Sequence, residues 1–181
     1  IRDSLEELAD VRACAERTGG QICVMLQNRT NPAVRRLKTF LETDRSLGKV
    51  LGITGFLTWR RDAAYYAQDP WRGKWSTEGG GLLINQAIHT IDLMGYLGGR
   101  ITEVRGSISN KTLNGIVEVE DTADAVFETE TGLRMCFYAT NGYAFSDPVR
   151  LEVRMEKGLL RYADNRLYRV TDDTCEVLAY D

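Results

Sequence analysis

Hydrophobic residues recur at every second position over much of this chain, which is the pattern of β-strands with one buried face. From Lys49 to Arg60, apolar residues alternate with glycines and threonines, and this spacing predicts a long strand. Further strands are predicted at Ile101–Ser109, Val117–Glu128, Leu133–Thr140, Val149–Glu156, Leu159–Tyr162, Arg166–Val170 and Cys175–Tyr180. Turn-forming pairs such as Asn114-Gly115 separate several of them. The pattern indicates an α+β fold with a large, mostly antiparallel sheet and helices packed on one face.

The segment 149–156 alternates most strictly. Its apolar positions are Val149, Leu151, Val153 and Met155, and the charged positions between them are Arg150, Glu152, Arg154 and Glu156. One face of this strand should therefore enter the core, while the other presents alternating charge on an outer, solvated face of the sheet.

A period of 3.6 residues marks a helix near the beginning of the chain. Its helically spaced apolar residues are Leu5, Leu8, Val11 and Ala15. Ser4 and Glu7 have the spacing of a capping box, and Gly19-Gly20 ends the pattern. The continuous apolar run Ile22–Leu26 then predicts a strand buried on both faces of a parallel sheet. Together these elements form half of an α/β unit.

A second helix is predicted after Asn31, which suits the N-cap position, with Pro32 at the first helical position. Its buried side is expected at Val34, Leu37 and Leu41. Arg29 precedes it, at the carboxyl end of the predicted buried strand, where ligands collect in open α/β sheets. Arg29 is therefore either a ligand contact or a plain charge in the connecting segment.

A third helix is predicted from Leu82 to Gly98-Gly99. Its expected buried stripe is Ile84, Ala87, Ile88 and Ile91, and a polar stripe consists of Asn85, His89, Asp92 and Tyr96. The polar stripe carries no Lys, Arg or Glu, unlike an ordinary solvated helix face, and is typical of a face that lines a cavity. The single histidine of the chain can equally be a surface or hydrogen-bonded structural residue.

The loop before this helix contains a triple glycine and a group of aromatic residues, and each allows two interpretations. Gly79-Gly80-Gly81 either leave backbone amides free for an anion or close ligand, or let the turn into the helix pack tightly. The loop also contains Tyr65, Tyr66, Trp71 and Trp75, with Arg72 and Lys74. Aromatic residues with a few cations can line a sugar-sized pocket, but aromatic loop residues also plug the edge of a core.

The run WRGKW…EGGGLLINQAIHTIDLMGYLGG resembles the corresponding segment of the glucose-fructose oxidoreductase/inositol dehydrogenase/MocA family. The resemblance covers the triple glycine, the pair Asn85 and His89, the pair His89 and Asp92, and the terminal Leu-Gly, and weaker similarity extends over nearly all of the chain. It implies a C-terminal α+β domain that carries substrate contacts and an oligomer interface, in an enzyme whose N-terminal Rossmann domain binds the cofactor.

This resemblance also implies a division of the chain. Residues 1–27 would be a remnant of the dinucleotide-binding domain, and residues 28–181 the substrate-binding and oligomerisation domain. No Gly-x-Gly-x-x-Gly turn follows a strand, so the cofactor turn and the family's catalytic lysine are expected outside this sequence. The sequence is strand-like up to Asp181, without the closing helical segments of the family, and we expect an internal fragment.

The resemblance assigns roles to residues of the polar helix. His89 would shuttle a proton, because an imidazole exchanges protons near neutral pH, and Asn85 would hold a substrate oxygen or orient the ring. Family members often have Asp where Asn85 stands, and an amide favours a protonated imidazole less than a carboxylate does. Asp92 is expected to be structural and to anchor the helix against a neighbouring loop. Expected substrate contacts are Tyr66, Trp71, Arg72 and Lys74, and expected cofactor contacts are Arg29 and Gln86.

Composition and charge narrow the functional class. The hydrophobic content of 43% is enough for the core of one domain, or of one domain with a remnant, and the net charge of −3 gives no basic stripe for nucleic acid. No apolar run approaches the roughly 18 residues of a membrane span, and we expect no export leader. The cysteines, Cys14, Cys23, Cys136 and Cys175, are far apart. Neither a metal site nor a disulfide framework is indicated, and reduced thiols in the cytoplasm are expected.

Two functions therefore remain open. The first is the C-terminal part of an NAD(P)-dependent oxidoreductase that transfers a hydride to or from a sugar, cyclitol or related polyol. NAD or NADP would be bound mainly by the missing N-terminal domain, the fragment alone would be inactive, and the protein would form a homodimer or homotetramer through its sheet face. The second is a non-catalytic binding or assembly module with the same fold. A hydrolase is disfavoured, because the chain has no Gly-x-Ser-x-Gly elbow.

Overall fold

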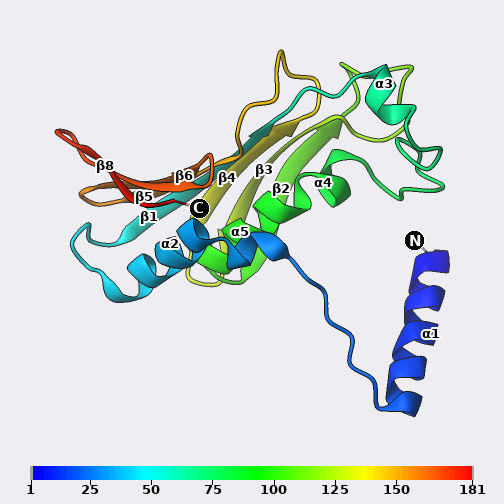
Figure 1. Cartoon of the computed structure of the whole chain (residues 1–181), viewed down its shortest axis with the longest axis horizontal. Helices are drawn as coiled ribbons and strands as arrows, with labels where there is room; N and C mark the ends of the chain where they lie inside the picture. The colour runs from blue at the N-terminus through cyan, green and yellow to red at the C-terminus, as the bar shows by residue number, and fades with distance from the viewer. Residues whose placement is uncertain (1, 181) are drawn as a thin grey trace.

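The described part of the chain, residues 2–180 with side chains from Leu5 onward in a computed structural model, is built around one eight-stranded sheet (Figure 1). The strands are β1 (Val50–Thr58), β2 (Ile101–Ser109), β3 (Thr122–Thr129), β4 (Arg134–Thr140), β5 (Arg150–Met155), β6 (Gly158–Ala163), β7 (Arg166–Val170) and β8 (Cys175–Tyr180). Their order is β2-β3-β4-β1-β5-β6-β7-β8. Only β1 and β4 among these strands run parallel, so the predicted mostly antiparallel sheet is confirmed.

The predicted strand at Val117–Glu128 begins too early, because β3 starts at Thr122. Residues before it form a loop in which Glu120 and Asp121 are buried and bind backbone amides. Glu120 accepts from the amides of Gly81 and Leu83. Asp121 accepts from the amides of Thr112 and Leu113 at 2.8 and 2.6 Å. Hydrogen bonds between a carboxylate and loop amides compete with the backbone pairing of a strand. Hydrophobic periodicity does not reveal such bonds.

The strict alternation over residues 149–156 is confirmed. Leu151 and Val153 are fully buried, whereas Arg150 and Arg154 are exposed on the opposite face. Helices lie on the first face only: α5 (Ile88–Gly98) packs against β1 and β4, and α2 (Pro32–Thr43) packs against β6, β7 and β8 (Figure 1). The hydrophobic core therefore lies between these helices and one face of the sheet.

Helix α2 begins as its sequence predicts. The side chain of Asn31 accepts from the amides of Ala33 and Val34, and Pro32 occupies the first turn. Its core positions are Ala33, Val34, Leu37 and Phe40, while the predicted Leu41 is only half-buried. A 3₁₀ turn, η1 (Gln27–Thr30), leads into this helix.

The N-terminal segment differs from its prediction in two ways. Helix α1 covers Arg2–Thr18, so Ser4 lies inside the helix and is not its N-cap, although Gly19 with a φ of 67° ends it as predicted. Residues 20–26 are extended but pair with no described strand, and Val24 is 81% exposed, so the predicted buried strand is wrong. A strand needs a neighbour for its backbone groups, and this segment instead spans from α1 to the sheet (Figure 1).

The predicted third helix is interrupted. It forms a short α4 (Leu82–Asn85), then α5, and the amide of Ala87 donates to the carbonyl of Leu82, five residues earlier, at 2.8 Å. This π-type turn rotates the two parts relative to each other. Ala87 is buried, but Ile84 is 51% exposed and Ile88 is 37% exposed, so the predicted apolar stripe is wrong at these positions. No helix in the described residues is long and apolar enough to cross a membrane.

Candidate functional site

A cavity of about 680 Å³ borders the interruption between α4 and α5. Its wall also includes η1, the residues after β1, the short helix α3 (Ala63–Tyr66), the loop before β5 and the turn between β6 and β7. Polar side chains of the wall include Gln27, Asn28, Arg61, Asn85, Gln86, Thr90, Ser146, Asp147, Asp164 and Asn165. A cavity of this size with several converging polar groups suits a small polar ligand.

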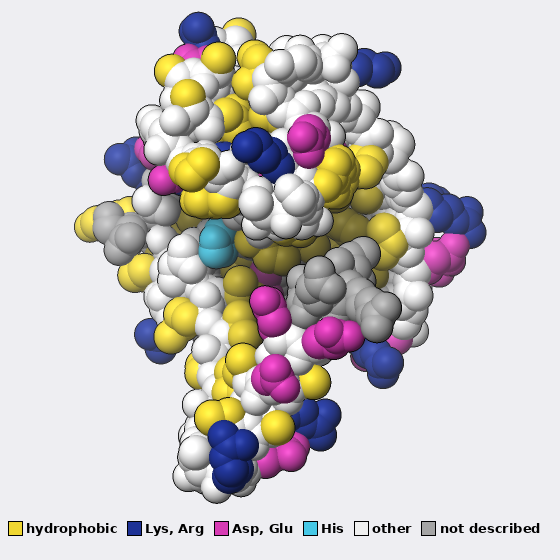
Figure 2. Space-filling model, turned by 90° about the vertical axis from the view of Figure 1, so that its right-hand side faces the viewer, with side chains coloured by type: hydrophobic (Ala, Val, Ile, Leu, Met, Phe, Trp, Pro, Cys, Tyr) yellow, Lys and Arg dark blue, Asp and Glu magenta, His cyan; other side chains and the backbone are white. Residues whose placement is uncertain are grey.

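His89 lies in the first turn of α5 and borders this cavity. Its side chain is half-buried, and Figure 2 shows the histidine reaching the surface between hydrophobic and uncharged side chains. The Nδ1 atom is buried and has no hydrogen-bond partner among the described residues. A proton on Nδ1 would be a buried donor without an acceptor, which costs free energy. Among the described residues, the favoured neutral tautomer therefore carries its proton on Nε2, and a proton on Nδ1 needs an acceptor from outside them.

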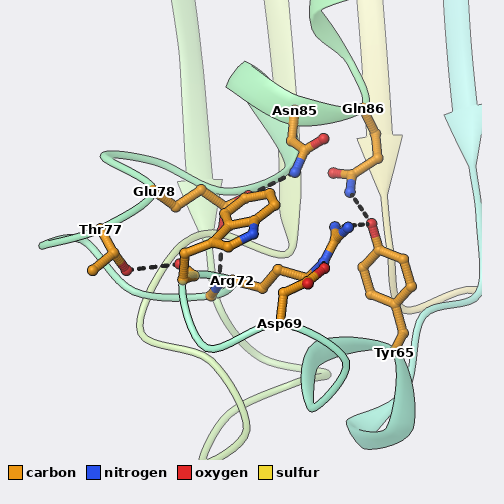
Figure 3. Close-up of polar contacts among 9 residues, drawn as sticks. Tyr65, Asp69, Arg72, Thr77, Glu78, Asn85 and Gln86 are labelled. Carbon is orange, nitrogen blue, oxygen red and sulfur yellow. Dashed lines mark hydrogen bonds and ion pairs between the residues drawn. The ribbon is translucent and has the colours of Figure 1, made fainter.

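Asn85 borders the cavity one turn before His89. Its Nδ2 atom donates to Oε1 of Glu78 at 2.7 Å, and Oε2 of Glu78 accepts from the amide of Gly73 at 2.6 Å (Figure 3). These two contacts fix the direction of the amide. Its Oδ1 atom is then directed away from Glu78, where it can accept a hydrogen bond from a ligand hydroxyl.

Gln86 and Tyr65 also border the cavity and are joined to each other. Nε2 of Gln86 donates to the Tyr65 hydroxyl at 3.1 Å (Figure 3). Oε1 of Gln86 accepts from Nδ2 of buried Asn141 at 3.2 Å. The same Asn141 amide donates to the hydroxyl of Tyr66 at 3.1 Å. Tyr66 itself is buried away from the cavity wall, and this burial raises the pKa of Tyr66.

The triple glycine before α4 packs tightly and binds an anion from within the chain. Both carboxylate oxygens of Glu120 accept from the amide of Gly81 at 3.0 Å, and one accepts from the amide of Leu83 at 2.9 Å. A Cβ on Gly81 would lie 2.4 Å from the carbonyl oxygen of Glu120, so only glycine fits there. Because Glu120 already occupies these amides, the tight-packing interpretation describes this turn.

Two predicted site residues near the polar helix are bound to partners in the fold. Arg29 donates through Nε to Asp92 at 2.8 Å and lies 5.0 Å from the ring centroid of Tyr96. The hydrogen bond to Asp92 raises the pKa of Arg29. The predicted anchoring role of Asp92 is therefore confirmed, and its partner comes from η1. Arg29 lies outside the cavity wall.

The predicted substrate contacts from the aromatic loop also lie outside the cavity wall. Arg72 donates to Asp69 at 2.8 Å and to the Tyr65 hydroxyl at 2.7 Å, and the hydrogen bond to Asp69 raises the pKa of Arg72. The guanidinium of Arg72 lies over the ring of Trp71, which is 40% exposed, and Lys74 is exposed. Of the residues predicted from the sequence, His89, Asn85 and Gln86 are brought together at the cavity.

The sequence predicts no site role for Trp59 or Arg61, and it names Tyr65 only as one of the loop aromatics that can line a pocket or plug the core edge. These three residues form one side of the wall, with the Arg61 guanidinium 4.7 Å from the Trp59 ring centroid and 4.8 Å from that of Tyr65. Asp62 caps the short helix α3 by accepting from the amide of Tyr65 at 3.0 Å, which turns Tyr65 toward the cavity and Tyr66 inward. The signal was the Asp-x-x-Tyr spacing of an N-cap, which orients neighbouring tyrosines differently.

Comparisons with known proteins agree with this fold. Residues 34–161 match the family model described as GFO/IDH/MocA C-terminal domain. The WlbA dehydrogenase from Bordetella pertussis, solved in complex with NADH and UDP-GlcNAcA, is 27% identical with a TM-score of 0.77, over 93% of this chain and 51% of that protein. Levoglucosan dehydrogenase, solved in complex with NADH and levoglucosan, is 23% identical with a TM-score of 0.74, over 87% of this chain and 46% of that protein.

A putative oxidoreductase from Thermotoga maritima shares the fold at 18% identity and a TM-score of 0.73, over 96% of this chain and 54% of that protein. No curated protein matches the sequence. The chain thus spans about half the length of these solved proteins.

Proposed function

The chain belongs to the GFO/IDH/MocA family, and we propose that it is the substrate-binding part of an NAD(P)-dependent oxidoreductase acting on a sugar, cyclitol or related polyol. One observation carries the proposal. A histidine with a buried, unpaired Nδ1 and an asparagine with its amide direction fixed by Glu78 border the same polar cavity. The relatives solved with NADH and a sugar ligand support the same assignment.

The residues present do not by themselves form a dinucleotide site. The sequence has no Gly-x-Gly-x-x-Gly turn, and Glu120 occupies the amide of Gly81. Arg29 is bound to Asp92, and the amide of Gln86 is held by Tyr65 and Asn141. We propose that the cofactor, which exchanges the hydride, is held mainly by another domain. The purified chain should then show no saturable NADH binding at low micromolar concentration.

The roles of this chain's residues follow from their positions. In the oxidation direction, the substrate hydroxyl gives its proton to Nε2 of His89 while its carbon loses a hydride, and a carbonyl forms. The ring must then carry its other proton on Nδ1, and we propose that the acceptor for that proton comes from outside the described residues. In reduction the same imidazole returns the proton to the oxygen. Oδ1 of Asn85 accepts a hydrogen bond from a substrate hydroxyl and holds that oxygen near the ring.

The proposal extends to the domain division, the oligomeric state and the cellular location of the protein. Residues 1–27 would belong to the dinucleotide-binding domain and residues 28–181 to the substrate domain, and the exposed apolar side chains of α1 would pack within the former. The charged open face of the sheet would form a homodimer or homotetramer interface, which light scattering can measure. We expect the protein in the cytoplasm, where its free, exposed cysteines stay reduced.

The test uses the whole protein that contains this chain. Nicotinamide absorbance is followed with NAD and NADP while levoglucosan, myo-inositol and UDP-GlcNAcA are offered in turn. Reduction of the cofactor with at least one of these compounds is the expected result. Ligand binding without any change in the cofactor would favour the alternative, a non-catalytic binding module with the same fold.

A further inference from the structure

The hydroxyl of Tyr65 lies at the end of a directed hydrogen-bond network at the cavity wall. The network begins at Asn141, which is fully buried and donates from Nδ2 to both Oε1 of Gln86 and the hydroxyl of Tyr66. With its oxygen accepting, Gln86 must donate from Nε2, and it does so to Tyr65 at 3.1 Å. In this network, the donor and acceptor of each hydrogen bond are therefore determined by the preceding bond.

A second donor reaches the same phenol oxygen. Nη1 of Arg72 lies 2.7 Å from the Tyr65 hydroxyl, and Nε of Arg72 is held by Asp69 at 2.8 Å (Figure 3). The Tyr65 oxygen thus accepts two hydrogen bonds, one of them from a cation. A phenol that accepts twice still has one hydrogen to donate, and no described residue accepts it.

The ring of Tyr65 is fixed in place as well. Two guanidinium groups flank it, that of Arg61 at 4.8 Å and that of Arg72 at 4.7 Å from the ring centroid. The hydroxyl therefore cannot easily turn away from the cavity that Tyr65 borders. A cationic donor on the oxygen also polarises the O–H bond and makes it a better donor.

We infer that the Tyr65 hydroxyl donates a hydrogen bond to an oxygen of the bound sugar or polyol, at the Gln86 side of the cavity. The inference rests on the proposed function, which supplies the substrate class. It assigns Tyr65 as a substrate-binding and specificity-determining residue that selects ligands with an oxygen acceptor at this position. Its neighbour Tyr66 is buried, lies outside the wall and has no such role.

The experiment compares Tyr65→Phe with Tyr66→Phe in the complete chain. Each variant keeps its ring and removes one hydroxyl that accepts a hydrogen bond from an amide side chain, so the two are matched. Binding of levoglucosan, D-glucuronate and myo-inositol is measured by proton NMR on the imidazole signals, which are unambiguous because the chain has one histidine. Loss of one hydrogen bond predicts about a 3- to 10-fold rise in Kd for Tyr65→Phe, and less than about two-fold for Tyr66→Phe.

Each result decides the matter. Equal affinities of the wild-type chain and Tyr65→Phe, with the histidine signals still shifting, would overturn the role of Tyr65 and leave the proposed function standing. No shift in the wild-type chain with any of the three compounds would overturn both. Should Tyr65→Phe fail to fold, Arg72→Met decides: it removes the cationic donor, together with the Asp69 ion pair, and keeps the Tyr65 hydroxyl. It should raise Kd about two- to three-fold, and an unchanged Kd would overturn the inference.

Discussion

The polar stripe along α4 and α5 is used in two different ways. Its members are Asn85, His89, Asp92 and Tyr96. The last two are bound: Arg29 pairs with the carboxylate, and the cations of Arg29 and Lys38 each lie 5.0 Å from the phenol ring centroid. The first two border the cavity, where the histidine Nδ1 has no partner and the asparagine is held through one side of its amide.

The difference arises from what packs over each half. The turn η1 and helix α2 bring Arg29 and Lys38 to the C-terminal half of the stripe, and Lys38 also donates to the carbonyl of Tyr96 at 3.0 Å. No charged side chain pairs with the N-terminal half except Glu78, which fixes the amide, among the described residues. Unused hydrogen-bonding capacity beside a cavity, rather than the stripe itself, therefore marks the candidate site.

The largest effect is expected from His89→Asn in the whole protein. The substitution keeps a polar side chain of similar reach, so the fold should survive, but the proton shuttle is lost. General acid–base catalysis contributes about 10²–10⁴-fold, so kcat should fall by roughly that factor. The measurement is kcat against pH, and one limb of the wild-type profile should disappear or move.

The control for this variant is Trp71→Phe, which changes an aromatic residue outside the cavity wall. It should leave kcat nearly unchanged. If His89→Asn instead retained more than about a third of the wild-type kcat with an unchanged pH profile, another group would carry the proton, and both halves of the stripe would be structural.

Much of the fold could be predicted from the sequence, because a sheet with one covered face imposes a period of two on its strands. The bounds of β2, β7 and β8 agree with the predicted segments, and the alternation in β5 agrees with its burial. The errors occur where a distant partner decides. Residues 22–26 have the composition of a buried strand but no strand beside them, and α4 and α5 are separated by one π-type turn that periodicity does not reveal.

The candidate site was less predictable. Asn85 and His89 were predicted to share a face, and both border the cavity although a π-type turn lies between them. The wall opposite them comes from loops and from residues far away in the sequence, such as Trp59 and Asn165. The Asp62 cap marks the start of α3, but which member of the Tyr65-Tyr66 pair faces the cavity depends on how that short helix packs, which the sequence does not show.

A smaller effect, on stability, is expected from Asp92→Asn. The Asp92 side chain is 8% exposed and its partner Arg29 is 46% exposed, so the pair is only partly screened. Replacing the charge-assisted bond by a neutral one should lower the free energy of unfolding by about 1–2 kcal/mol. Urea unfolding of the purified chain measures this change.

The matched variant is Arg12→Gln in α1, which breaks an ion pair whose side chains are 79% and 67% exposed. Exposed pairs of this kind contribute roughly 0–0.5 kcal/mol. Equal losses in the two variants would show that the Asp92 contact does not hold η1 on α5, and the contrast between the two halves of the stripe would fail.

The smallest effect is expected from Lys74→Ala, although the sequence predicts Lys74 as a substrate contact. Its side chain is exposed and lies outside the cavity wall, so the substitution should change KM by less than about two-fold, as for a typical surface position.

The control is Arg61→Ala, which removes a cation of similar length from the wall itself and should raise KM several times more. Both are measured in the whole protein with the substrate that the nicotinamide assay identifies. A rise in KM of about five-fold or more for Lys74→Ala, matching Arg61→Ala, would mean that the loop at residues 71–78 folds over the bound substrate. That loop would then form a second wall of the cavity and would belong to the site, together with Asn85 and His89.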